Sequence, residues 1–128
     1  MDIVVCTDFS PNSKKAFRQA LSLSKCTKQR VVHVLTVSST RVEANDNRLD
    51  GYIEMGLEAG CQVLPIVLEG QFPSQVIIQK VDEMMEDGKQ VIVVVGSRGI
   101  SGAASKFLLG SVSDNLVQCC NAHVMVVK

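Results

Sequence analysis

The stretches IVVCTDFSP, residues 3–11, and VIVVVGSRG, residues 91–99, decide the fold of this chain. Each begins with a continuous apolar run rich in β-branched residues and then changes to polar residues with proline or glycine. A strand with one face in water would alternate apolar and polar side chains, so these runs predict strands that are covered on both faces. We therefore expect both strands at the centre of a sheet.

Helical patterns alternate with strand patterns along the rest of the chain. Ser10 followed by Pro11 is a helix-start signal, and the apolar residues after it recur at helical spacing to about residue 26. The remaining patterns predict strands at 31–37, 61–68 and 123–127, and helices at 73–88 and 114–120. Between the second and third strands we expect only a weak helix, because Gly51 and Gly56 interrupt it.

The alternation of strands and helices predicts right-handed crossovers and a parallel sheet with helices on both faces. Pro65 lacks a donor for the strand ladder, which indicates that the third strand lies at an edge. The predicted fold is an α/β, doubly wound, five-stranded parallel sheet with strand order 3-2-1-4-5, in a single domain of residues 1–128. Ligands in such sheets bind where the order reverses, here between the first and fourth strands.

Charge and composition exclude several kinds of partner. Thirteen Lys and Arg balance thirteen Asp and Glu, so nucleic acid is not an expected partner. No run reaches the roughly 18 apolar residues of a membrane span, and no targeting signal is evident, so we expect a soluble cytoplasmic protein. The five cysteines lack metal-binding spacing and are expected to be reduced, with no metal site. A redox role for the adjacent pair Cys119 and Cys120 stays open.

The loop from Gly96 to Ser113 carries the strongest functional signal. It opens with Gly96-Ser97-Arg98-Gly99 and closes with Gly110-Ser111-Val112-Ser113. Glycines let the backbone approach phosphates, and the free amides and dipole at a helix start favour anions. The alternative is a flexible turn and a helix cap, which the same residue types also form. Because the two clusters are expected to meet at the switch point, we favour a phosphate-binding loop.

Five segments carry a resemblance to a known family: VVCTDFSPNSKKAF (4–17), VVHVLTV (31–37), GSRG (96–99), LLGSVSDNLV (108–117) and HVMVVK (123–128). Together they make nearly the whole chain, from Asp2 to Lys128, similar to the universal stress protein family. The ATP-binding branch of that family has Gly, two residues, Gly, nine residues, and then Gly followed by Ser or Thr. Here Gly96 and Gly99 fit that pattern, but ten residues separate Gly99 from Gly110.

The resemblance implies a protein that binds ATP, with Mg²⁺, and takes part in the stress response. It implies that the adenine lies near Asp8 and Val34, with Cys6 and Thr7 lining the site. It also implies that the triphosphate lies along Gly96, Gly99, Gly110, Ser111, Val112 and Ser113. The alternative for Asp8 is local, because an acid at a strand end commonly binds the amides of the following loop.

The residues favour binding over catalysis. No catalytic constellation is evident, and the G-x-x-x-x-G-K-[ST] loop of one NTPase class does not occur, so we expect at most a slow ATP hydrolase. The leading hypothesis is an ATP-binding regulatory module. The alternative is a nucleotide-free dimeric interaction protein of the same fold. In both cases the apolar last strand, His123 to Val127, is expected at an open sheet edge, which favours a homodimer through that strand.

Overall fold

The computed structural model describes residues 1–39, 47–98 and 109–128. All neighbouring strands pair in parallel, and the order in the sheet is β3-β2-β1-β4-β5, as predicted. The strands are β1 (Asp2–Cys6), β2 (Val31–Ser38), β3 (Gln62–Glu69), β4 (Val91–Gly96) and β5 (His123–Val127). The strand order predicted from the sequence is therefore confirmed.

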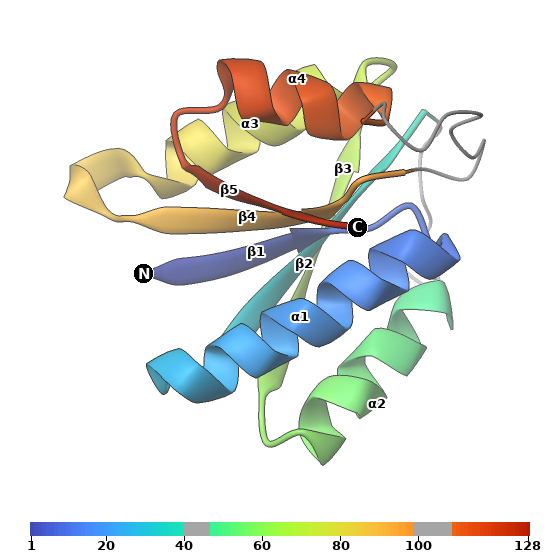
Figure 1. The fold of residues 1–128 in the computed structure, drawn as a ribbon, viewed down its shortest axis with the longest axis vertical. Coiled ribbons are helices and arrows are strands. Elements are labelled where there is room, and N and C mark those ends of the chain that lie inside the picture. The colour runs from blue at the N-terminus through green and yellow to red at the C-terminus, as the bar shows by residue number, and fades with distance from the viewer. Residues whose placement is uncertain (40–46, 99–108) are drawn as a thin grey trace.

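Helices cover both faces of this sheet. They are α1 (Pro11–Thr27), α2 (Asp50–Glu58), α3 (Pro73–Met84) and α4 (Ser111–Cys119), with short 3₁₀ turns at η1 (Asn47–Leu49) and η2 (Glu86–Gly88). Figure 1 shows α1 and α2 on one face of the sheet and α3 and α4 on the other. Among the described residues, none of these helices has the length and apolar character needed to cross a membrane.

Strand β1 is buried from both sides. Ile3 and Val5 belong to the apolar cluster on the α1 face, and Val4 and Cys6 belong to the cluster on the α3 face. None of these four residues is more than 6% exposed. This explains the continuous apolar run in the sequence, because a strand at the centre of a parallel sheet has no wet face. β3 instead lies at an edge, as predicted, and its Pro65 is exposed.

Three helices differ from the prediction. α3 ends at Met84 rather than at residue 88, and the last residues of the predicted helix form the separate turn η2. α2 runs without interruption through Gly51 and Gly56. Glycine is required at position 56 because a Cβ there would overlap a methyl group of Val63 on β3. α4 begins at Ser111, three residues before the predicted start at 114. Its first turn is closed by the Ser113 hydroxyl, which donates to the Gly110 carbonyl oxygen at 3.0 Å.

Two adjacent residues of α4 test the packing of this helix. Leu116 is 0% exposed and Val117 is 50% exposed. We expect Leu116→Ala to lower the free energy of unfolding by about 2–5 kcal/mol, because it leaves a cavity in the core. Val117→Ala is the matched control and should change it by no more than about 0.5 kcal/mol. Urea denaturation followed by circular dichroism measures both, and equal effects would contradict the packing described here.

Candidate functional site

The switch point of the sheet lies between the carboxyl ends of β1 and β4. β1 and β4 pair with each other. On its other side β1 pairs with β2, and on its other side β4 pairs with β5. Figure 1 shows α1 and α4 both beginning at this edge of the sheet. Open parallel sheets bind their ligands outside the carboxyl ends of the strands at such a point. The residues that follow β1 and β4 are therefore the candidate site.

Immediately after β1, the buried Thr7 hydroxyl is held by three groups. Its Oγ1 accepts from the Phe9 backbone N–H at 2.9 Å and lies 3.0 Å from Ser13 Oγ and 2.7 Å from the Tyr52 hydroxyl. Ser13 donates its own proton to the Ser10 carbonyl oxygen, so it accepts from Thr7. Tyr52 must then donate to Thr7. The Thr7 hydroxyl thus uses its one proton and both lone pairs inside the protein.

This network occupies the hydroxyl of Thr7. Its side chain is 6% exposed and its hydroxyl has no remaining capacity for a ligand, so it fixes the turn. That Thr7 lines the nucleotide site stays a prediction. No functional residue was predicted near α2, so the role of Tyr52 was missed. The available signal was that Tyr52 is the chain's one tyrosine, and a buried phenol normally requires a polar partner.

The turn between β1 and α1 exposes Asp8. Its Oδ1 accepts from the Ser10 backbone N–H at 3.0 Å, which is the local role given above as the alternative. The next residue, Phe9, has a φ of 64°, a left-handed conformation that is uncommon outside glycine and is concentrated at functional sites. The Phe9 ring lies edge-on to Tyr52, and the Arg48 guanidinium lies 4.2 Å from its centroid. α2 and its preceding turn therefore border the site.

After β4, the backbone passes close to the first turn of α1. Gly96 is buried, and a Cβ there would lie 3.1 Å from the Asn12 carbonyl oxygen and would overlap the Asn12 side chain. The Ser97 N–H donates to the Val127 carbonyl oxygen at 2.8 Å, and the Arg98 N–H donates to Asn12 Oδ1 at 2.7 Å. Gly96 is thus required by packing against α1, whatever else it contacts.

The start of α4 closes the other side of the site. The Gly110 N–H donates to the Ser97 carbonyl oxygen at 2.7 Å, and Gly110 caps α4 with extended backbone and no side-chain hydrogen bond. Within residues 1–39, 47–98 and 109–128, no acceptor is found for the amides of Ser111, Val112 and Ser113. The predicted residue Gly99 lies outside the described residues.

Cys6 and Val34, the other two residues predicted at this side of the site, are buried on opposite faces of the sheet. Val34 is 0% exposed, in the cluster on the α1 face, and Cys6 is 6% exposed, in the cluster on the α3 face. Burial raises the pKa of the Cys6 thiol to about 12, with a smaller contribution from Cys120. Cys6 is therefore a neutral thiol at physiological pH and behaves as an apolar side chain. Contact of either residue with a ligand stays a prediction.

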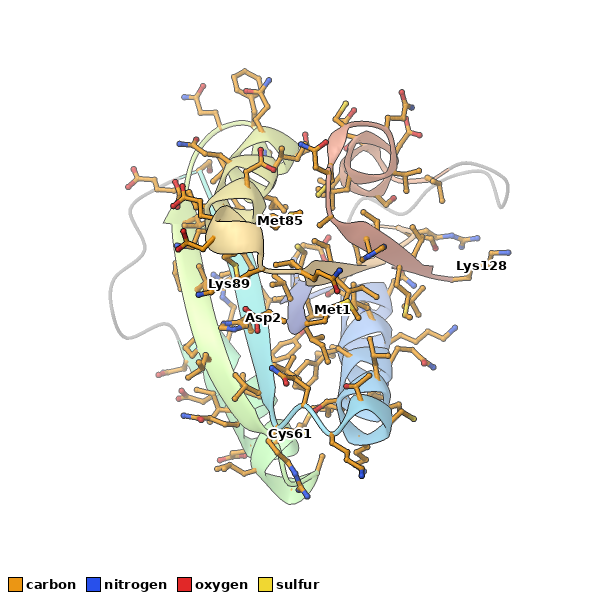
Figure 2. The ribbon with its side chains drawn as sticks, turned by 90° about the vertical axis from the view of Figure 1, so that its left-hand side faces the viewer. Met1, Asp2, Cys61, Met85, Lys89 and Lys128 are labelled. Carbon is orange, nitrogen blue, oxygen red and sulfur yellow. The ribbon has the colours of Figure 1, made fainter. Side chains whose placement is uncertain are left out.

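A separate cleft lies at the amino ends of the strands, opposite the candidate site, where β2 and β3 begin. Figure 2 shows this end of the sheet, with Asp2, Cys61 and Lys89 at or near the starts of strands. The cleft is lined by Ser24, Lys25, Lys28, Arg30, Ala59, Gly60 and Cys61. α1 and α2 both end here, and the partial negative charge of helix carboxyl ends favours nearby basic residues. We therefore do not assign these basic residues to phosphate binding.

Comparison with known proteins identifies the family. The model of the universal stress protein family matches residues 1–128. The chain belongs to the universal stress protein family. No curated protein matched the sequence.

Solved universal stress proteins share the fold of this one over its whole length. UspA from Lactobacillus plantarum is 16% identical with a TM-score of 0.81, and the match covers 100% of this chain and 97% of that one. A protein from Archaeoglobus fulgidus in complex with dAMP is 22% identical, with a TM-score of 0.72 and coverage of 100% and 98%. A universal stress protein in complex with cAMP is 23% identical, with a TM-score of 0.77 and coverage of 100% and 96%. These likenesses establish the fold.

The phenol of Tyr52 can be tested without a ligand. Tyr52→Phe keeps the ring that packs against Phe17 but removes the proton donated to Thr7. We expect the free energy of unfolding to fall by about 1 kcal/mol, since a buried lone pair loses its partner. In a double-mutant cycle with Thr7→Val, the double variant should lose less than the sum of the two single losses. Strict additivity in urea denaturation would show that the two hydroxyls do not interact.

Proposed function

We propose that this universal stress protein binds an adenine nucleotide, ATP with Mg²⁺, at the switch point between β1 and β4. The observation that carries the proposal is the amino end of α4, where the amides of Ser111, Val112 and Ser113 lack acceptors among the described residues. Such amides, together with the helix dipole, favour a phosphate group. Their position beside the end of β4 is set by the bond from Gly110 to Ser97.

Two further observations support an adenine nucleotide over a simple phosphate. An exposed carboxylate, Asp8, stands at the end of β1, on a turn held by Thr7 and Tyr52. In addition, two proteins of the same fold were solved with cAMP and with dAMP, both of which carry adenine and a phosphate. ATP is the proposed ligand here because the family pattern of glycines and serines is largely present.

The proposed role is regulatory. The groups assigned to the phosphates are backbone amides and glycines, which hold an anion but do not take a proton from an attacking water. Hydrolysis is therefore expected to be slow at most. A nucleotide that binds the folded state alone raises its stability and biases the conformations that partners meet. The cellular role that follows is a nucleotide-dependent module of the stress response in the cytoplasm.

We also propose a homodimer joined through β5. The Val127 carbonyl oxygen accepts from Ser97 on the β4 side, and backbone groups in a parallel ladder alternate in direction along the strand. Val124 and Val126 therefore direct their N–H and C=O groups to the open edge. An apolar edge strand of this kind favours pairing with a second copy. In the alternative function, a nucleotide-free interaction protein, this edge is the functional surface.

Nucleotide binding is tested by denaturing the purified protein, identifying any released nucleotide by mass, and titrating ATP with Mg²⁺ into the emptied protein by calorimetry. Gly110→Asp should weaken binding more than tenfold, because its carboxylate accepts from the α4 amides and repels phosphate. Its stability should be retained, since Asp is a favourable N-cap. Gln79→Glu on α3 adds the same charge away from the site and should bind as the wild type does. Wild-type protein that binds nothing at millimolar ATP would overturn the proposal.

The dimer is tested by sedimentation velocity at micromolar concentration. We expect the wild type to sediment as a dimer and Val126→Pro as a monomer, because proline removes an N–H that points to the open edge. Proline is tolerated on an edge strand where the N–H faces solvent, so the variant should remain folded by circular dichroism. A wild-type monomer at this concentration would contradict pairing through β5.

A further inference from the structure

One side-chain amide joins the two chain segments that end at the site. Asn12, in the first turn of α1, accepts from the Arg98 N–H through Oδ1 at 2.7 Å and donates from Nδ2 to the Val127 carbonyl oxygen at 3.4 Å. Both contacts require the same orientation of the amide, because Arg98 offers only a donor and Val127 only an acceptor. The shorter contact sets the direction of the chain just after β4.

The surroundings of Asn12 hold it in place. Its side chain occupies the volume that a Cβ at Gly96 would take, so glycine at position 96 is what admits it. The helix that carries it is capped by Ser10, whose Oγ accepts from the Ser13 N–H at 3.2 Å, and is anchored by the fully buried Phe17. Asn12 therefore lies on a helix that is held in place, and it faces residues 96–98, where the glycine-rich segment begins.

We propose that Asn12 is a positioning residue of the nucleotide site, setting how the chain leaves β4 at Arg98. The proposal deepens the proposed function and rests on it, since the neighbouring Ser97 accepts from Gly110 and so places the α4 amides that are assigned to the phosphates. Asn12 accepts from the Arg98 amide and, within the part of the chain that the structure describes, makes no hydrogen bond with the amides of Ser111, Val112 and Ser113, which are the ones assigned to the ligand. The contact with Val127 keeps the amide from rotating, so the end of β5 serves as its anchor.

Two substitutions separate the contacts of Asn12. Asn12→Ala removes both of them. Asn12→Asp has the same shape and keeps an oxygen acceptor for Arg98, but it loses the donor to Val127. Under both a space-filling role and a positioning role, aspartate should behave like asparagine, so the alanine variant separates the two roles. A space-filling role gives an effect of alanine that spreads over the amides of α1 and β4, whereas a positioning role gives an effect localised at the Arg98 amide.

The first measurement uses nucleotide-free protein, so that it does not depend on ATP binding. Hydrogen exchange of the Arg98 amide is followed by NMR in the wild type and both variants at pH 7, where the aspartate is ionised. We expect exchange to be about tenfold faster in Asn12→Ala and close to the wild-type rate in Asn12→Asp. An unchanged Arg98 exchange rate in Asn12→Ala would overturn the role of Asn12.

The second measurement is ATP affinity by calorimetry. Asn12→Ala should bind ATP about three- to tenfold more weakly than the wild type, which is the effect expected from losing the short bond to Arg98. The matched control is Asn115→Ala, which removes an asparagine whose side chain bonds to Ser74 at 3.2 Å. Its ATP affinity should stay within about twofold of the wild-type value. Equal affinity of Asn12→Ala and wild type would overturn the inference alone. Failure of the wild type to bind would instead overturn the proposed function, whatever the exchange data show.

Discussion

The burial of β1 on both faces is the constraint on which the site depends. Because β1 is covered on both faces, water does not reach the polar groups of the residue that follows it. The protein must therefore supply hydrogen-bond partners where the strand ends. Thr7 meets this requirement by bonding to three neighbours, from the following turn, from α1 and from α2. Because Tyr52 supplies one of these bonds, α2 is tied to the switch point although the rest of the helix packs on β3. The position of Asp8 is a consequence of this network.

The same requirement applies at the end of β4, and the first turn of α1 helps to meet it. Ser97 is bonded to Val127 and to Gly110, while Arg98 is bonded to Asn12. Asn12 and Ser13 are neighbours in sequence, and each holds one of the two segments that leave the centre of the sheet. A shift of α1 would therefore move both sides of the candidate site together. This makes the helix start a shared support for groups that lie far apart in the sequence.

Much of the fold could be predicted from the sequence, because the signals that decide it are local. The continuous apolar runs of β1 and β4 and the proline of β3 were enough to predict the strand order. The failures arose where the decisive contact is distant in the sequence. Glycine is required at position 56 because α2 packs closely against Val63 on β3. The buried hydroxyl of Tyr52 is explained by its bond to Thr7, which lies 45 residues away in the sequence. The single tyrosine indicates that a buried phenol needs a polar partner, but no residue near either position identifies the partner.

Two hydroxyls that the sequence pattern places at the site are engaged within the protein. Thr7 Oγ1 bonds to Phe9, Ser13 and Tyr52, and Ser113 Oγ donates to the Gly110 carbonyl oxygen. The amides at the start of α4 have no acceptor among the described residues, and the exposed Asp8 carboxylate lies at the end of β1. The amides and the helix dipole attract phosphate, whereas a carboxylate repels it. In the proposed nucleotide complex, this difference favours phosphates at the amino end of α4 and the adenine near Asp8, which is the orientation that the family resemblance implies.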